Sequence, residues 1–296
     1  MSSDTGSIVI LDQDYPSTLE SVDIVEADIL KAAVDAGFGE DEQHEVGMAV
    51  RECMVNAVVH GNRYNKNKYV HVKVTKSAVD FAIRITDQGE GVFPHVRSGL
   101  GLEDLFAAIQ ELTKGRTTTA PDRHTGEGIF FASKAVDVFA LSSAGLTWTV
   151  DNLRNDQAVG ISPVTAGTRV TCEIDPATDR SLAKVFARFT DDNFDFSRSS
   201  TVVHLFGLAV RFVSRSEAKR LLQGLDRFKQ VEIDFTGVQD VGQGFVDELV
   251  RVWPVQHPGT TITPTHMNPA VEFMVRRGLR RSDPDAPQAQ QGLPGR

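Results

Sequence analysis

A carboxylate and a carboxamide stand four residues apart in the otherwise apolar stretch between Arg51 and Asn62. An α-helix has about 3.6 residues per turn, so Glu52 and Asn56 are expected on one helical face, with His60 slightly off it. Mg2+ prefers oxygen ligands, and the side-chain carbonyl of Asn56 can supply one. Glu52 is placed to take a proton from an attacking water or hydroxyl group. A structural polar pair is the alternative explanation.

A D-x-G-x-G motif at residues 87–91 follows the alternating run from Phe81 to Ile85, which predicts a strand. A carboxylate only accepts hydrogen bonds, so Asp87 can hold the exocyclic amine of adenine and disfavours guanine, which presents an acceptor there. Gly89 and Gly91 permit close approach of a flat base. Asp and Gly are also common turn residues, so a simple turn is the alternative.

A third element is the sequence Gly126-Glu127-Gly128 in front of an apolar run that predicts a helix. Amide groups at that helix start can face phosphate. A glycine pair before a helix is often only a loop. A rival pair, Gly99 and Gly101, follows the D-x-G-x-G motif too closely to leave room for a lid, so the later pair is preferred.

Residues 113–124 have no apolar periodicity and are expected to form a lid over a bound ligand. The segment offers cations at Lys114, Arg116 and Arg123, and its threonines, Thr118 among them, offer hydroxyl groups. His60 has no metal-ligand partner at a usable spacing, so we expect a structural or supporting role for it.

The order E-x-x-x-N-A-x-x-H-G, D-x-G-x-G, G-x-G resembles the nucleotide-binding site of the GHKL ATPase and kinase superfamily, and most of all the anti-sigma serine kinases within it. The resemblance implies an α/β fold, a two-layer sandwich with a mixed sheet, and the cofactors ATP and Mg2+. It assigns Glu52 as the catalytic base and Asn56 as the metal ligand. The ATP-binding residues that it implies are Asn56, Asp87, Gly89, Gly91, Lys114, Arg116, Thr118, Gly126, Glu127 and Gly128.

A domain boundary is expected within residues 175–198, where Asp-Pro, Asp-Asp-Asn and Ser-Arg-Ser-Ser occur. Alternating strand and helix patterns follow and favour a smaller α/β domain with parallel pairing. The predicted organisation is an ATP-binding domain at 15–176, a linker at 177–198, a second domain at 199–281 and a disordered tail at 282–296.

Residues 231–245 are similar to the strand, loop and helix of STAS domains, and residues of about 199–281 look like the STAS-like domain that accompanies such ATPase domains. Where an anti-sigma factor antagonist carries a phosphorylatable serine, this chain has Gly242 and Gln243. We therefore expect the second domain to dock a partner or read a signal.

Local patterns also predict the individual elements. A turn at residues 14–17 is followed by a helix to about Ala36, and the helix that carries Glu52 begins near Glu40. The remaining expected strands are 69–76, 79–86, 138–142, 146–153, 167–174, 201–205, 230–235 and 260–263, and the remaining helices are 128–136, 181–189, 214–225 and 243–253.

The 296-residue chain has 31 basic and 40 acidic residues, a net charge of −9, which argues against broad binding to nucleic acid or anionic membranes. Its cysteines, Cys53 and Cys172, form no C-x-x-C motif, so neither a disulfide framework nor a zinc site is indicated and a reduced, cytoplasmic protein is expected. No membrane span or signal peptide is predicted. The basic cluster at 276–281 favours a solvated helix end, with an acidic partner or nucleic acid as the alternative.

Three functions remain open. The first is a regulatory switch in which binding or hydrolysis of Mg-ATP changes how the STAS-like domain engages a regulatory protein, of sigma-factor or antagonist type. The second is a serine/threonine protein kinase of the anti-sigma type that acts on a separate protein. The third is an interaction module with a degenerate pocket. A histidine kinase is disfavoured because no histidine-bearing dimerisation helices precede the ATP-binding motifs, and a homodimer is implied by resemblance only.

Overall fold

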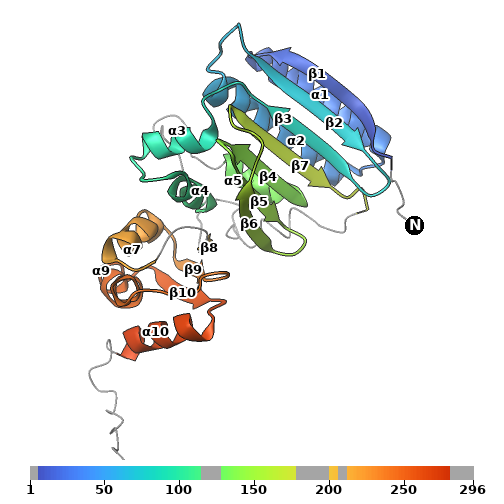
Figure 1. Ribbon diagram of the computed structural model, residues 1–296. Helices are drawn as coiled ribbons and strands as arrows, with labels where there is room; N and C mark the ends of the chain where they lie inside the picture. Colours follow the sequence, from blue (N-terminus) through green and yellow to red (C-terminus); the bar gives the residue numbers. More distant parts are fainter. Residues whose placement is uncertain (1–5, 115–127, 178–199, 206–211, 281–296) are drawn as a thin grey trace, which may run out of the picture. The chain divides into compact units, whose positions relative to one another are not determined.

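The computed structural model describes residues 6–114, 128–177, 200–205 and 212–280, and its contacts divide the chain into two compact units, Met1–Ser197 and Arg198–Arg296 (Figure 1). Several predicted features lie outside the described residues. These are Arg116, Thr118, Arg123, Gly126 and Glu127, most of the predicted lid, the helix at 181–189 and the tail at 282–296.

A seven-stranded sheet forms the first unit, in the order β1-β2-β3-β7-β4-β5-β6. The strands are β1 (Ile8–Pro16), β2 (Tyr69–Lys76), β3 (Phe81–Thr86), β4 (Val138–Ser143), β5 (Leu146–Asp151), β6 (Asp156–Ile161) and β7 (Thr168–Ile174). The α/β sandwich is confirmed, but every described pair of neighbouring strands is antiparallel, whereas a mixed sheet was predicted. Strands β3 and β4 run parallel to each other, but they are not neighbours. Strand β7 lies between them and pairs antiparallel with both.

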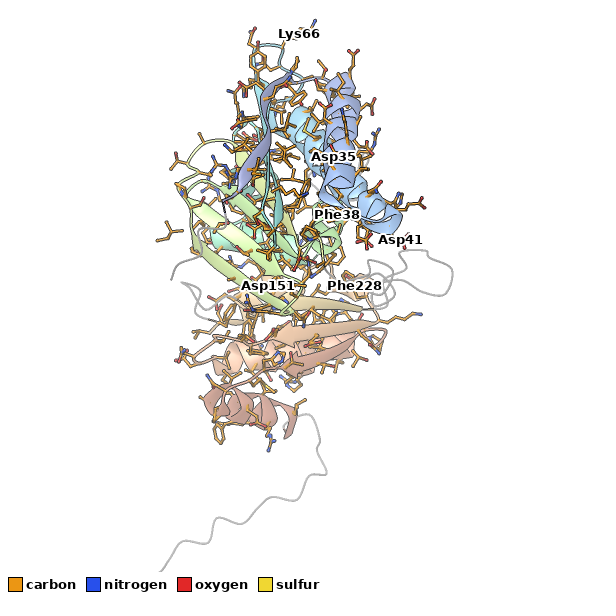
Figure 2. All side chains as sticks on the ribbon, turned by 90° about the vertical axis from the view of Figure 1, so that its right-hand side faces the viewer. Asp35, Phe38, Asp41, Lys66, Asp151 and Phe228 are labelled. Atoms are coloured by element: carbon orange, nitrogen blue, oxygen red, sulfur yellow. The ribbon has the colours of Figure 1, made fainter. Side chains whose placement is uncertain are left out.

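The helices of this unit are α1 (Leu19–Ala36), α2 (Glu40–Val55), the π-helix η1 (Asn56–Gly61), α3 (Val92–Gly99), α4 (Leu105–Thr113) and α5 (Gly128–Ala135). Helices α1 and α2 lie side by side on one face of the sheet, and the turned view agrees (Figures 1 and 2). The predicted end of α1 at Ala36 and the predicted start of α2 at Glu40 are confirmed.

Alternate side chains of the strands form the core between sheet and helices. The register aligns Val72, Ile85, Val170, Leu141 and Trp148 in one buried row across five strands. Because side chains alternate across a strand, this register sends all five to the helical face. Burial of such side chains contributes about 1.5–3 kcal/mol each, so this row is a main source of the unit's stability.

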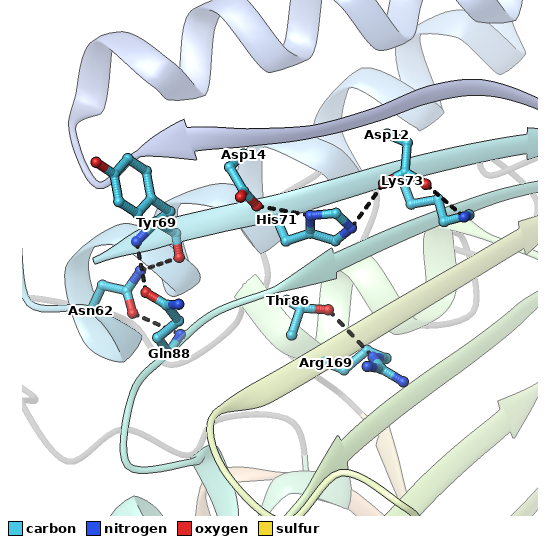
Figure 3. Close-up of polar contacts among 9 residues, drawn as sticks. All are labelled: Asp12, Asp14, Asn62, Tyr69, His71, Lys73, Thr86, Gln88 and Arg169. Carbon is cyan, nitrogen blue, oxygen red and sulfur yellow. Dashed lines mark hydrogen bonds and ion pairs between the residues drawn. The ribbon is translucent and has the colours of Figure 1, made fainter. Parts of the chain in front are cut away.

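Aromatic packing adds to this core. Phe38 lies just after α1 (Figure 2). Its ring contacts that of Phe81 edge to face, with the ring centroids 5.1 Å apart. The other face of the sheet is polar (Figure 3). There Lys73 Nζ binds Asp12 Oδ2 at 2.6 Å. Such exposed ion pairs contribute about 0–1 kcal/mol, so they keep this face hydrated more than they hold the sheet together.

Two edge strands and two helices were not predicted from the sequence. Residues 14–16 were expected to form a turn but end β1, which has a register shift between Val9 and Leu11 and is mostly exposed. Strand β6 buries only Val159 well, so its hydrophobic alternation is weak. Helices α3 and α4 flank a turn in which Gly101 takes a φ of +63°, so the rival glycine pair joins two helices.

The second unit is a parallel sheet with helices packed on its apolar face. Strands β8 (Ser200–His204), β9 (Gln230–Asp234) and β10 (Thr261–Thr265) lie in the order β10-β9-β8, which confirms the predicted parallel pairing. The helical segments are α7 (Arg215–Leu222), η2 (Leu225–Arg227), α8 (Gln243–Asp247), η3 (Glu248–Val252), α9 (Trp253–Gln256) and α10 (Pro269–Arg280). Val203 of β8 and Ile233 of β9 belong to the buried core that the sheet forms with these helical segments.

Asn62 joins three segments of the first unit at the end of η1 (Figure 3). Its amide donates to Ser17 Oγ at 2.8 Å and to the Tyr69 carbonyl at 2.9 Å. Its Oδ1 accepts from the Gln88 backbone amide at 2.8 Å. One buried side chain therefore fixes the start of β2 and the loop after β3 relative to the helix.

Asn62→Ala is expected to lower the free energy of unfolding by about 1–3 kcal/mol, because it removes the hydrogen bonds to the buried Ser17 hydroxyl and to two partly buried backbone groups. Asn67→Ala is the matched control, since Asn67 is exposed in the same loop region, and it should change stability by less than about 0.5 kcal/mol. Urea unfolding of the two variants measures the difference. Equal stability of the two variants would contradict the structural role of Asn62.

Candidate functional site

Helix α2 widens into a π-helix at Asn56, one turn after Glu52. The Asn62 backbone amide accordingly donates to the Ala57 carbonyl, five residues earlier, at 2.8 Å. Single π turns inside α-helices occur frequently at functional sites. Glu52, Asn56 and His60 all line the same pocket. His60, expected in a supporting role, is therefore part of the pocket wall.

The pocket has a volume of about 350 Å3, within the range of small-molecule sites. Five of the residues selected from the sequence line it, and they come from all three motifs: Glu52, Asn56, Asp87, Gly91 and Gly128. The tertiary structure thus brings a helix face, a strand end and a helix start to one cavity.

Gly128, the first residue of α5, packs directly against the polar face of α2. A Cβ atom at this position would collide with Glu52 Oε2 and would lie 3.8 Å from Asn56 Nδ2. A side chain at this position would displace the Glu52 carboxylate, so glycine lets α5 begin this close to it. The start of α5 and the Glu52 carboxylate are therefore in close contact.

Asp87 follows the last residue of β3 and is 6% exposed. Its Oδ1 accepts hydrogen bonds from the backbone amides of Gly89 at 2.7 Å and Thr168 at 3.1 Å. Burial raises the pKa of this carboxyl group above its usual value, and the bonds from Gly89 and Thr168 oppose that rise. The carboxyl group is a buried acceptor at the pocket wall.

Glycines leave the space that the Asp87 carboxylate occupies. A Cβ on Gly61 would lie 2.5 Å from Asp87 Cγ, and one on Gly89 would lie 2.5 Å from the Gly61 carbonyl oxygen. Gly167 has a φ of +68°, in the left-handed region that favours glycine. Gly89 thus supports the site through backbone packing and does not itself line the pocket.

Thr168 belongs to the site, although the sequence analysis did not select it. Its Oγ1 accepts from the Val92 amide at 3.0 Å, and its carbonyl accepts from the Asp87 amide at 2.9 Å. Thr168 also lines the pocket. It stands 81 residues from Asp87 at the start of β7, so no local signal links the two.

Comparison with protein-family models assigns both units. Residues 15–150 match the histidine kinase-like ATPase domain, and residues 217–272 match the STAS-like domain of unknown function. The chain combines a histidine kinase-like ATPase domain with a C-terminal STAS-like domain. Such an ATPase domain is consistent with ATP binding and with an ATP-using kinase or ATPase. No curated protein matches the chain.

Apolar side chains form a large part of the pocket wall in the ATPase domain. Its hydrophobic lining comes from the sheet, from α2 and η1, and from helices α3, α4 and α5. The main residues of this lining are Ile85, Val92, Val96, Leu112, Ile129, Phe131, Phe139, Leu141 and Val170. Such walls suit a flat, largely apolar ring system held by a few directed polar groups.

Glu90 and His95 also line the pocket of the ATPase domain. Glu90 Oε1 lies 2.6 Å from His95 Nδ1 and 2.6 Å from the Arg63 guanidinium. The hydrogen bond with His95, together with the charge of Arg63, holds the pKa of Glu90 below its usual value. Glu90 therefore stays ionised beside the site.

Lys114 differs from its predicted place in the lid. Thr113 ends α4, and Lys114 caps this helix as a fully buried side chain whose ammonium group pairs with Glu111. The end of α4, a helix that the sequence analysis did not predict, thus occupies the first two residues of the predicted lid. Among the residues that the structure describes, the pocket lining contains no lysine or arginine.

Within the described residues, no helix is long and apolar enough to span a membrane. Within the same residues, no group of three or more His, Cys, Asp or Glu side chains has an arrangement that could hold a metal ion by itself. Any Mg2+ at the pocket would need ligand oxygens from the nucleotide as well as from the protein.

Gly61→Ala is expected to lower the free energy of unfolding of the ATPase domain by about 1–3 kcal/mol, since its Cβ would overlap the Asp87 carboxyl group. Gly160→Ala is the matched control, because the nearest atom to a Cβ there is 3.6 Å away, on Thr147. Urea unfolding compares the two. A stable Gly61→Ala variant with an unaltered pocket would show that the close packing around Asp87 is not required.

Proposed function

We propose that the ATPase domain binds Mg-ATP in this pocket and that its nucleotide state controls how the STAS-like domain engages a regulatory protein. The observation that carries the proposal is the convergence of Glu52, Asn56 and Asp87 on one cavity of about 350 Å3. A polar pair and a turn that were only structural would have no reason to share a cavity. Their convergence favours nucleotide binding over a degenerate interaction module.

The hydrogen bonds of Asp87 support adenine recognition. Both backbone donors bind Oδ1, so Oδ2 is the oxygen that can accept from the adenine amine. Guanine would present a carbonyl oxygen to the same carboxylate, which is unfavourable because neither group donates. Ile85, Leu141 and Val170 supply apolar surface for the ring.

The charge of the pocket supports the need for Mg2+. Its acidic lining includes Glu52, Asp87 and Glu90, and its described lining has no lysine or arginine. A triphosphate next to these carboxylates requires a counter-cation, and bound Mg2+ would neutralise phosphate charge there. Asn56 is the residue that would hold the ion, through its side-chain carbonyl.

Glu52 is proposed as the general base. It lies on the pocket wall beside Asn56, and Gly128 at the start of α5 packs against its carboxylate. A shift of Gly128 would therefore alter the position of Glu52, which would couple ligand binding to proton transfer. This coupling is the basis proposed for the switch.

A serine/threonine kinase acting on a separate protein is the second candidate. Gly242 is the N-cap of α8, and a Cβ there would lie 2.5 Å from Val213 Cα. Backbone packing thus excludes a serine at this position of the STAS-like domain unless Val213 moves. This helix start therefore offers no hydroxyl acceptor, and a kinase of this kind would act on a separate protein.

Asp87→Asn is expected to weaken ATP binding by about 100-fold or more. The carbonyl of the introduced carboxamide would keep the bonds from Gly89 and Thr168, so its amino group would face the adenine amine, donor against donor. Asp80→Asn, outside the pocket lining, is the control and should bind ATP normally. Direct calorimetric titration measures both, and undiminished affinity of Asp87→Asn would remove the adenine assignment.

Glu52→Gln is expected to keep ATP affinity and to reduce turnover by about 100-fold, because the amide cannot take a proton. Glu40→Gln, an exposed substitution at the other end of α2, should keep full turnover. The assay follows γ-labelled ATP with Mg2+, alone and with added cell extract. Label in free phosphate identifies an ATPase, label on serine or threonine identifies a kinase, and a fully active Glu52→Gln would show that another base is used.

A further inference from the structure

The STAS-like domain carries a cluster of two histidines and an aspartate where its parallel strands end. His204 is the last residue of β8, Asp234 is the last of β9, and His266 follows the last residue of β10. The register pairs Asp234 with His204 on one side and with Thr265 on the other. Ligands of open α/β sheets bind preferentially at this carboxyl edge.

Asp234 binds both imidazole rings. Its Oδ2 lies 3.0 Å from His204 Nδ1, and its Oδ1 lies 3.1 Å from His266 Nδ1. The amide and hydroxyl of Thr236 donate to the same Oδ1 at 2.9 and 2.7 Å. Burial alone would raise the pKa of Asp234, but hydrogen bonds from His204 and Thr236 hold it well below its usual range. The carboxylate is therefore ionised and only accepts.

An accepting carboxylate fixes the tautomer of each neutral ring. Nδ1 must carry the proton that Asp234 accepts, so Nε2 carries the lone pair. The His266 side chain is 64% exposed, whereas that of His204 is 16% exposed. Solvent and ligands therefore reach the His266 ring far more readily.

The backbone of His266 supports a positioned ring. Its φ is +50°, in the left-handed region that is uncommon for residues other than glycine. Such conformations persist where surrounding interactions hold them, and they cluster at functional sites. The contact with Asp234 is an interaction of that kind.

We propose that His266 Nε2 is a phosphoryl acceptor and that Asp234 is the positioning residue that fixes its ring. A carboxylate on the other ring nitrogen sets the tautomer and stabilises the cation that forms on attack. The Nε2 lone pair forms a bond to the γ-phosphorus, and the bond from that phosphorus to the β,γ-bridging oxygen breaks. ADP leaves with the electron pair, and the Nδ1 proton stays shared with Asp234.

The proposal rests on the proposed function for its donor, ATP bound by the ATPase domain. The acceptor in this proposal is an imidazole nitrogen, not the hydroxyl group that is missing at Gly242 and Gln243. It also differs from a histidine on helices ahead of the ATP-binding motifs, since His266 lies after them in the chain. The acceptor is thus a new site within the STAS-like domain.

The first test uses phosphoramidate, a small phosphoryl donor that needs no ATP site, on the full-length protein. Exposed His44 on α2 serves as the internal reference. His266 is expected to be modified about 10-fold faster than His44, as measured by mass spectrometry of peptides kept at alkaline pH. Asp234→Asn should bring the His266 rate down about 10-fold and leave the His44 rate unchanged. Equal rates at His266 and His44, or no effect of Asp234→Asn on His266, would overturn the proposal.

The second test uses Mg2+ and γ-labelled ATP, with ATP binding to each protein titrated in parallel. An acid-labile, alkali-stable label is expected on His266 and should be lost in His266→Asn, which tolerates the left-handed backbone, and in Asp87→Asn. His44→Gln should keep the label. Bound ATP without label on His266 overturns the proposal. Absence of ATP binding means that the proposed function itself has failed and removes the donor, while the phosphoramidate rates still decide whether His266 is an activated nucleophile.

Discussion

Burying a carboxylate costs free energy unless hydrogen bonds compensate it, and this constraint shapes the region around Asp87. Two backbone amides, from Gly89 and Thr168, point at one oxygen of the side chain. Gly61 leaves room for the carboxylate, because a Cβ there would overlap it, and Gly167 leaves room for the Asp87 backbone carbonyl in the same way. The loop after β3, the end of η1 and the start of β7 must all keep their backbone geometry for the acceptor to remain available.

The strand order explains how these segments meet. Strand β7 lies between β3 and β4, so Thr168 at its start stands beside the end of β3. The π turn at η1 continues α2 past Asn56 and ends next to the same loop, where Asn62 binds the Gln88 amide. Helix α5 then places Gly128 against Glu52. A motif-bearing helix and two distant turns thus form one pocket because the antiparallel sheet holds their ends together.

The two units use different chemistry at their sheet ends. In the ATPase domain, a buried acceptor lies in an apolar pocket, which suits recognition of a ring with an amine. In the STAS-like domain, Asp234 is satisfied by His204, His266 and Thr236 at an exposed edge, which suits a positioned nucleophile. The proposed phosphoryl donor and the proposed acceptor thus belong to two domains of one chain, which fits the regulatory role proposed above.

Local signals in the sequence determined the α/β character, the end of α1, the start of α2, the parallel second sheet and the three motifs, because periodicity and glycine placement act within a few residues. They did not reveal β1 and β6, whose exposed edges bury too little to alternate. Only the tertiary structure brought Thr168 to Asp87 and His266 to Asp234, since strand pairing joins residues far apart in the chain. It also placed Lys114 in an ion pair with Glu111 at the end of α4, a helix that the sequence analysis did not predict.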